Sequence, residues 1–190
     1  MYGAVADPYC YDGTGVLRNI PGIRDQAALD AFEAVSTMQR SDELLPTGRM
    51  SVRHYQAIHH HLFQDVYPWA GKFRTVRISK NTSTFCYPEN MRKEMGKLFA
   101  DLRRTKYLRG LSRERFAVHA AHFLASLNAI HPFREGNGRT QMIFLVLLVS
   151  GTEHAIDLQK LVPERFLAAT IASFHGDESA LVGELARLIA

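Results

Sequence analysis

The sequence predicts an all-α fold with a central buried helix and one β-hairpin. Apolar residues recur at helical spacing along most of the chain. Residues 142–149 are apolar in almost every direction around a helix, which indicates a helix surrounded by others. Only residues 75–87 alternate between apolar and polar side chains as strands do. Because the chain has 190 residues and an ordinary globular composition, we expect a single domain, 1–190.

The expected helices follow from apolar stripes and from end signals. They cover 25–39, 51–65, 88–103, 112–129, a segment from about 137, 163–174 and 178–189. Ser51 and Ser112 stand at N-cap positions, and Pro163 suits a first helical turn. The residues expected to face the core in the first helix are Ala28, Leu29, Phe32 and Val35. In the second helix they are Tyr55, Ile58, Leu62 and Phe63, and in the third Met91, Met95, Leu98 and Leu102.

The segment 75–87 is the one expected hairpin. Val76 and Ile78 alternate with polar neighbours, a polar tip follows at 81–83, and 84–87 return. A lone two-stranded hairpin is marginally stable, so it must pack on the helices. Its exposed edge offers unpaired N–H and C=O groups to an incoming strand.

A polar loop, HPFREGNGR at 131–139, leads into the apolar run. The first N–H groups of a helix lack intrahelical partners and lie at the positive end of its dipole, so they bind anions. Gly136 and Gly138 permit unusual backbone angles and close approach of a ligand. Arg139 supplies a planar donor fork suited to phosphate. The loop therefore predicts a phosphate site.

The other side chains of this loop each have a functional and a structural interpretation. His131 can accept a proton from an attacking hydroxyl, or it can simply end the preceding helix. Glu135 can hold a Mg²⁺ ion that bridges phosphate oxygens, or serve the helix dipole alone. Asn137 can donate to a phosphate oxygen, cap the helix, or do both. Phe133 is expected to anchor the loop in the core, and Arg134 to be a solvated charge.

The loop resembles the Fic family motif, HxFx(D/E)GNGRxxR, at every fixed position except the last. The segment YPWAGKFRT at 67–75 is similar to the one that leads to the family's β-hairpin flap, and ISKN at 78–81 is similar to the flap itself. NAI at 128–130 precedes the motif as in family members, and the start, DPY at 7–9 with LRN at 17–19, resembles small Fic toxins. These matches span most of the chain.

The resemblance implies a Fic domain with its core at about 50–150, its flap at about 75–87 and C-terminal helices at about 163–190. It implies transfer of AMP from ATP to a hydroxyl side chain of a target protein, with Mg²⁺ as cofactor. The flap residues expected to dock the target main chain are Ile78, Ser79, Lys80 and Asn81.

The same resemblance implies a role for each loop residue. His131 would deprotonate the target hydroxyl, and Glu135 would bind Mg²⁺. The N–H groups around Gly136 and Gly138 would form an anion hole. Asn137 would contact the α-phosphate, and Arg139 would reach further along the triphosphate. Related Doc proteins carry a lysine at the position of Gly138 and transfer a terminal phosphate, so the glycine favours AMP transfer.

Met142 stands where the family has its second arginine, which is expected to pair with the γ-phosphate. Methionine has no donor, and losing one charge-assisted hydrogen bond costs about 1.5–3 kcal/mol. That is roughly ten- to hundredfold in ATP binding or rate, which predicts a weakened transferase. Core packing is the structural reason for an apolar residue there. Two alternatives stay open: an impaired Fic-fold binding module, and a transferase that uses another nucleotide donor.

The resemblance also implies partners. Fic proteins are often inhibited by a helix carrying (S/T)xxxE(G/N), whose glutamate pairs with the second arginine. This chain lacks the pattern, so we expect a separate antitoxin protein, although Met142 removes the partner of its glutamate. Small toxins of this type act on the ATPase subunits of gyrase and topoisomerase IV, which are the expected targets.

Composition bounds the remaining function classes. The net charge of +4 is mild, and the basic stretch at 103–115 is expected to be a solvated connection, so direct nucleic-acid binding is not expected. The histidines at 59–61 point in different directions from a helix and predict no metal site. The two cysteines, the lack of a secretory leader and the shortness of 142–149 favour a cytoplasmic protein without a membrane partner. A secreted effector without a classical signal peptide is the alternative.

Overall fold

The computed structural model describes residues 7–80 and 83–190. The helices are α1 Gln26–Ser41, α2 Val52–Phe63, α3 Pro88–Arg104, α4 Arg113–Ile130, α5 Asn137–Ser150, α6 Pro163–Phe174 and α7 Ser179–Leu188. Two 3-10 helices, η1 Lys106–Leu108 and η2 Leu158–Lys160, lie in the connections. The all-α prediction is confirmed, and the expected helix ends agree to within a few residues. None of the described helices combines the length and the apolar character needed to cross a bilayer.

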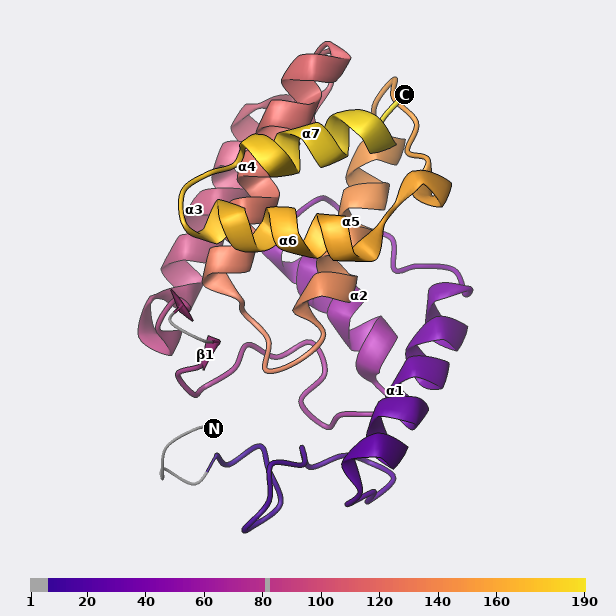
Figure 1. Ribbon diagram of the computed structural model, residues 1–190, viewed down its shortest axis with the longest axis vertical. Helices are drawn as coiled ribbons and strands as arrows, with labels where there is room; N and C mark the ends of the chain where they lie inside the picture. Colours follow the sequence, from indigo (N-terminus) through magenta and orange to yellow (C-terminus); the bar gives the residue numbers. More distant parts are fainter. Residues whose placement is uncertain (1–6, 81–82) are drawn as a thin grey trace.

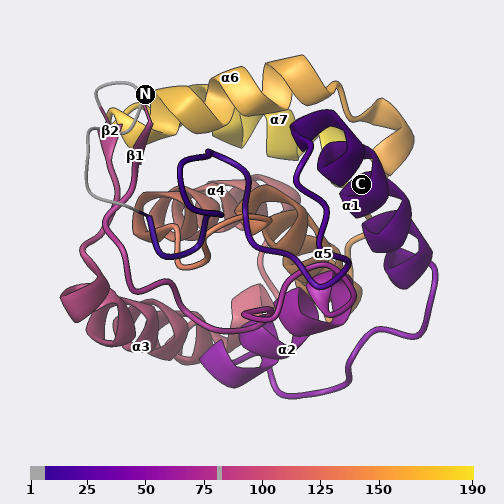
Figure 2. The same ribbon diagram turned by 90° about the horizontal axis from the view of Figure 1, so that it is seen from below.

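The helices surround a central pair. Helices α4 and α5 lie in the middle, with α6 and α7 on one side, α3 and α2 on the opposite side, and α1 beside α2 (Figure 2). The loop that joins α4 to α5 lies at the end of the molecule that also carries the N-terminal segment and the strand β1 (Figure 1). The 131–139 loop is therefore surrounded by segments that are distant from it in the sequence.

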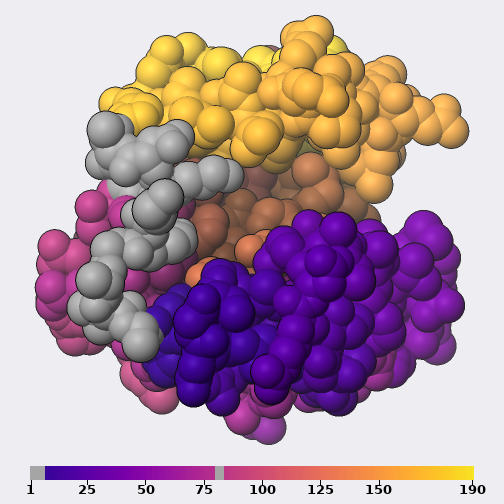
Figure 3. Space-filling model, turned by 60° about the horizontal axis from the view of Figure 1, so that its bottom comes forward, coloured from indigo at the N-terminus to yellow at the C-terminus, as the bar shows by residue number. Residues whose placement is uncertain are grey.

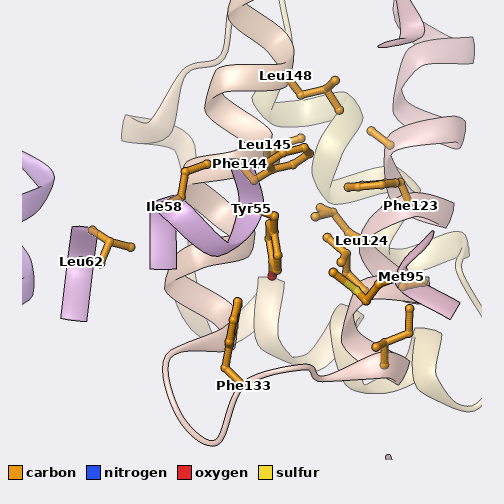
Figure 4. Packing of buried hydrophobic residues seen from close by; sticks show 14 of the residues in the cluster. Tyr55, Ile58, Leu62, Met95, Phe123, Leu124, Phe133, Phe144, Leu145 and Leu148 are labelled. Atoms are coloured by element: carbon orange, nitrogen blue, oxygen red, sulfur yellow. The ribbon is translucent and has the colours of Figure 1, made fainter. Parts of the chain in front are cut away.

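The core forms where α2, α4 and α5 meet. Tyr55 of α2 packs edge-on against Phe144 of α5, with ring centroids 5.5 Å apart. Phe133 points from the loop toward Tyr55, and their rings stack with centroids 5.5 Å apart (Figure 4). Helix α4 can be enclosed on several sides because four of its buried residues are alanines, namely Ala117, Ala120, Ala121 and Ala125. The loop and the core thus share one aromatic cluster.

Helix α5 is central, but one of its faces is only half-buried. Phe144, Leu145, Leu148 and Val149 are buried, whereas Met142, Ile143, Val146 and Leu147 are partly exposed. One face of this nearly continuous apolar run therefore packs in the core, and another face is partly exposed.

The inward face of α1 is not the one that its apolar residues predict. Ala28 and Val35 are exposed, Phe32 is half-buried, and of the expected stripe only Leu29 is fully buried. The other buried positions are Glu33, Ser36 and Thr37. The expected stripe is wrong because α1 turns polar groups inward, where Glu33 meets the charged side chain of Arg139. In α2, by contrast, all four expected core residues are buried, and Ser51 caps the helix through the N–H of His54.

The hairpin segment contains only a short antiparallel pairing. Strand β1, Ser79–Lys80, pairs with β2, Ser83–Thr84, in the register Ser79 with Thr84. The rest of 75–87 is irregular in the described residues, so extended pairing over the whole segment is not observed. Ile78 is buried and Phe85 stacks on His131, which ties the base of the strand pair to the helices.

Candidate active site

His131 lies at the C-cap of α4 in a left-handed conformation, with φ 49° and ψ 63°. Its backbone N–H still donates to the carbonyl of Leu127 at 2.9 Å, so the helix ends at this residue. Its imidazole stacks on Phe85, with ring centroids 4.0 Å apart and an interplanar angle of 21°. A non-glycine residue in this region costs about 1–3 kcal/mol and persists only where its surroundings hold it.

The buried guanidinium of Arg74 holds the backbone of His131. Arg74 is 2% exposed, and its Nε donates to the carbonyl oxygen of His131 at 2.8 Å. Its Nη atoms donate to the carbonyls of Val76, Cys86 and Ile130 at 2.6, 2.6 and 3.2 Å. Burial lowers the pKa of Arg74 to about 10, so it stays protonated at neutral pH. It is stabilised there by carbonyls at the negative end of the α4 dipole.

The interior of the loop is closed by Phe133 and Asn137. Phe133 is fully buried, which confirms the predicted anchor. Asn137 is also buried, and its Oδ1 accepts from the N–H of Phe133 at 3.0 Å while its Nδ2 donates to the carbonyl of Phe133 at 2.8 Å. Asn137 is not the N-cap, which is Gly136. Its amide instead clamps the loop into shape.

The N-terminus of α5 depends on the two glycines in different ways. Gly136 has φ 79°, and a Cβ there would overlap the ring of Phe63, so only glycine fits. A Cβ at Gly138 would have no neighbour within 4 Å, so the helix start is open at that point. The N–H groups of the first turn have no intrahelical acceptors and are available to an anion.

Glu135 lies beside this helix start. Its Oε1 accepts from the N–H of Gly136 at 2.9 Å and lies 3.7 Å from Nη2 of Arg139. The side chain is 47% exposed, so the carboxylate can reach a ligand. A single accessible carboxylate near an anion site fits a Mg²⁺ ion that takes its other ligands from substrate phosphates and water.

His59 of α2 holds the backbone of Glu135 through a hydrogen bond. Its ring is fully buried between Phe133 and Phe63, with centroid distances of 3.7 and 4.6 Å. Nδ1 accepts from the N–H of Gly71 at 2.8 Å, so the proton is on Nε2, which donates to the carbonyl of Glu135 at 3.0 Å. Burial lowers the pKa of His59 to about 3, which keeps the ring neutral.

Arg139 is bound at one edge. Its Nη2 donates to Oε1 of Glu33 at 2.5 Å, and Oε2 of Glu33 accepts from the hydroxyl of Tyr67. The guanidinium carbon lies 4.7 Å from the centre of the Phe63 ring. The Glu33 side chain is 12% exposed and that of Arg139 is 40% exposed. The arginine therefore keeps accessible donors while its position is fixed.

Arg134 is not the solvated charge that the sequence predicts. Its Nη2 lies 2.8 Å from Oδ2 of Asp7, and their side chains are only 12% and 22% exposed. Tyr9, in the same N-terminal segment, makes a second contact: its hydroxyl accepts a hydrogen bond from the N–H of Thr75 at 3.1 Å. The N-terminal segment thus closes over both the loop and the start of the hairpin.

The other predicted positions lie near the loop or outside the described residues. Ile78 is buried, and the backbones of Ser79 and Lys80 form β1, while Asn81 lies outside the described residues. Met142 is partly buried and packs against the core, in agreement with its structural interpretation. A recess runs between the N-terminal residues and the C-terminal helices, and residues of the 130–150 region form its floor (Figure 3).

Sequence reasoning missed four residues that hold the loop, namely Asp7, Glu33, His59 and Arg74. Each is a polar residue far from the loop in sequence, and periodicity assigns such residues to the surface. One usable signal was the position of Asp7 and Arg74 inside segments that resemble the Fic family. Glu33 and His59 carried no such mark.

Comparison with known proteins gives a consistent result. The model of the Fic/DOC family matches residues 49–149. A probable protein adenylyltransferase of Sinorhizobium fredii is 50% identical over 189 residues, which are 99% of this chain and 98% of the relative. The protein adenylyltransferase VbhT of Bartonella schoenbuchensis is 38% identical over 179 residues, covering 93% of this chain and 37% of VbhT.

Solved structures resemble the fold over almost the whole chain. The BepC protein of Bartonella tribocorum, a VirB-translocated effector solved with bound AMPPNP, has a TM-score of 0.85 and 25% identity, covering 96% of each chain. The N-terminal Fic domain of a Bartonella quintana effector with bound ADP has a TM-score of 0.86 and 27% identity, covering 96% of this chain and 94% of its own.

Proposed function

Because the chain belongs to the Fic/DOC family and its relatives are named protein adenylyltransferases, we propose that it transfers AMP from ATP to a hydroxyl side chain of a target protein. The main support is the arrangement of the 131–139 loop. Its two ends carry a candidate base, His131, and a helix N-terminus, and partly buried contacts from outside the loop hold both ends. The nucleotides bound by the Bartonella relatives support ATP as the donor.

In the proposed reaction the target hydroxyl oxygen attacks the α-phosphorus of ATP, and His131 takes the hydroxyl proton. The bond from the α-phosphorus to the bridging oxygen breaks, and pyrophosphate leaves with the electron pair. The N–H groups of the first turn of α5 bind the phosphate oxygens, and Arg139 binds the phosphates beyond. Asn137 contributes mainly by shaping the loop, since both of its amide atoms bond to the Phe133 backbone.

Glu135 is the residue that would hold Mg²⁺. When bound, the ion would supply positive charge that offsets the negative charge of the phosphates. Among the described residues there is no group of three or more His, Cys, Asp or Glu side chains suited to a metal ion, so most ligands would come from nucleotide and water. The contact between Glu135 and the N–H of Gly136 fixes the carboxylate beside the expected phosphate position.

A labelling experiment tests this function. The purified chain, Mg²⁺ and bacterial lysate are incubated in parallel with ATP labelled at the α- or the γ-phosphate. Label on a protein from the α position only, absent with His131→Ala, supports AMP transfer. Label from the γ position would contradict it, because phosphate transfer would then be the reaction. Label from neither position with native or variant protein would leave the binding-module alternative.

Met142 is proposed to weaken transfer by leaving one phosphate contact unmade. Met142→Arg should raise the rate or ATP affinity about tenfold. Met142→Leu is the matched control, since it conserves the packing without adding a donor. An equal gain in both variants would show that packing, and not the phosphate contact, limits the activity. A panel of competing nucleotides separates the alternative in which another donor is used.

We propose that the enzyme acts in the cytoplasm as the toxin of a toxin–antitoxin pair, with the ATPase subunits of gyrase and topoisomerase IV as targets. VbhT, a longer relative, is named a protein adenylyltransferase, which supports the reaction but neither the toxin role nor the targets. Exposed apolar side chains on α1, Val35 and Met38, and on α6, Leu167 and Ile171, offer contacts for a separate inhibitor. Labelling of purified gyrase and topoisomerase IV subunits tests the targets, and failure with an active enzyme would exclude them.

A further inference from the structure

Residues 67–74, YPWAGKFR, run from the end of α2 toward β1. They contact the 131–139 loop directly through Phe73 and Arg74, and they reach it indirectly through His59 and Glu33. We propose that this segment is a strut that positions the two ends of the loop separately. Arg74 sets the position of His131, and Tyr67, acting through Glu33, sets the position of Arg139. The inference rests on the proposed function, since it assigns positioning residues to the base and to the phosphate-binding arginine.

At the His131 end, the strut uses a residue with no substitute of equal geometry. The guanidinium of Arg74 donates to four carbonyls, two of them at the end of α4 and two on the segment that leads to and from the strand pair. Its own backbone N–H donates to the carbonyl of Pro132 at 2.9 Å. A lysine has three donors at one point and cannot reach four carbonyls arranged around a plane. Arg74 thus fixes the left-handed backbone from which the His131 ring projects.

At the Arg139 end, the strut works through a carboxylate. Tyr67 is 3% exposed, and its hydroxyl donates to one oxygen of Glu33. The other oxygen of Glu33 accepts from Arg139 at 2.5 Å. The hydroxyl therefore orients the carboxylate, and the carboxylate holds one edge of the guanidinium. Burial and the bond to Glu33 both raise the pKa of Tyr67, so it remains a donor throughout the physiological range.

Between these ends the strut is fixed to α2. Gly71 donates its N–H to His59 at 2.8 Å and accepts at its carbonyl from Nε2 of Gln56 at 3.0 Å. A Cβ at Gly71 would lie 2.8 Å from Cβ of His60 and 2.9 Å from the carbonyl oxygen of Gln56, so any other residue here would clash with α2. Because the middle is fixed, a change at one end is not expected to reach the other.

This independence separates positioning from simple stabilisation of the fold. If the segment only supported the core, each substitution would lower thermal stability and reduce activity in proportion to the folded fraction. If it positions the two ends, Arg74 affects turnover and Tyr67 affects nucleotide binding. Positioning therefore predicts that Arg74→Lys lowers kcat with little change in nucleotide affinity, whereas Tyr67→Phe weakens nucleotide affinity with little change in kcat.

The experiment uses the full chain and measures kcat with α-labelled ATP and Kd for AMPPNP with Mg²⁺ by calorimetry. Arg74→Lys should lower kcat at least about tenfold with Kd changed less than about twofold. Tyr67→Phe should raise Kd about three- to tenfold with kcat at saturation changed less than about twofold. All variants are assayed well below their Tm, so that the folded fraction is complete.

Two control variants match these changes elsewhere. Tyr55→Phe removes a buried hydroxyl that has no hydrogen-bond partner in the described part of the chain, so both constants should stay unchanged. Arg40→Lys disturbs an arginine that binds Asp65 and Glu43, neither of them part of the loop, and should leave kcat unchanged. A fall in kcat with either control would mean that general destabilisation explains the effect.

The results also separate this inference from the proposed function. If wild-type protein transfers no label but binds AMPPNP, the proposed function fails, and the strut is judged from Kd and from the NMR signals of the His131 imidazole. Those signals should move in Arg74→Lys and not in Tyr67→Phe. Parallel losses in both variants, or tighter AMPPNP binding in Glu33→Gln, would overturn the strut, the latter because Glu33 would then compete with the nucleotide for Arg139.

Discussion

The neutral ring of His59 makes the stability of the protein depend on pH in a way that can be calculated. Its Nδ1 accepts from Gly71 and its Nε2 donates to Glu135, so a second ring proton would break the first bond. Burial lowers its pKa to about 3, whereas an unfolded histidine titrates near about 6.5. The prediction concerns the change in the free energy of unfolding when the pH falls from 7 to 4.5.

The sign follows from proton binding. Between the two pKa values the unfolded chain binds a proton that the folded chain does not, so stability falls as the pH falls. The contribution of His59 is complete above about pH 6.5 and decreases below it by about 1.4 kcal/mol for each pH unit. Because the slope approaches this value only about one unit below pH 6.5, the loss through this residue alone between pH 6.5 and pH 4.5 should be about 2 kcal/mol.

Urea unfolding at pH 7 and at pH 4.5 measures this loss. His59→Gln keeps a donor near the carbonyl of Glu135 but does not titrate, so its loss of stability should be about 2 kcal/mol smaller than that of the native protein. His119 is exposed, and His119→Gln should behave like the native protein. Equal pH dependence in the native protein and in His59→Gln would refute the assignment of a buried neutral ring.

The remaining predictions concern the loop itself. Gly136→Ala should disrupt the loop and lower the free energy of unfolding, measured in urea, by more than about 2 kcal/mol. The reason is that alanine would adopt a left-handed backbone and its Cβ would overlap the Phe63 ring. Gly138→Ala should be neutral or stabilise by up to about 1 kcal/mol, since its surroundings are open and alanine favours helix, and an equal cost at both glycines would contradict this. Phe133→Ala should cost about 3–5 kcal/mol by the same measurement, and a cost below about 1 would mean that the anchor is dispensable. A double-mutant cycle on Asp7 and Arg134 should give a coupling of about 1–2 kcal/mol, above the value usual for exposed pairs, and no coupling would place this pair among them.

The helices were predictable because their signals are local. Ser51 caps α2 as expected, and the buried residues Tyr55 and Ile58 follow from helical spacing alone. The same rule predicted the wrong buried face for α1, because the face that is buried carries Glu33 and Thr37. A carboxylate can be buried only where a partner compensates it, and the partner, Arg139, lies more than one hundred residues later in the chain. No local pattern contains that information.

The functional residues of the loop were predictable, whereas the residues that hold the loop in place were not. The sequence identified His131, Glu135, Gly136 and Arg139 as candidates because their chemistry is compact in the chain. It did not indicate that Arg74 would be buried among backbone carbonyls, because an arginine in an irregular segment reads as solvated. The partners of such a residue are carbonyl groups, which every residue carries and no sequence pattern marks.

The partners described for the 131–139 loop share one property with a consequence for how the protein is made. Asp7, Glu33, His59 and Arg74 all precede the loop in the chain, so on the ribosome they are synthesised before it. Because domains generally fold as units, the loop is expected to close only when α6 and α7, which pack against α4, have also been synthesised.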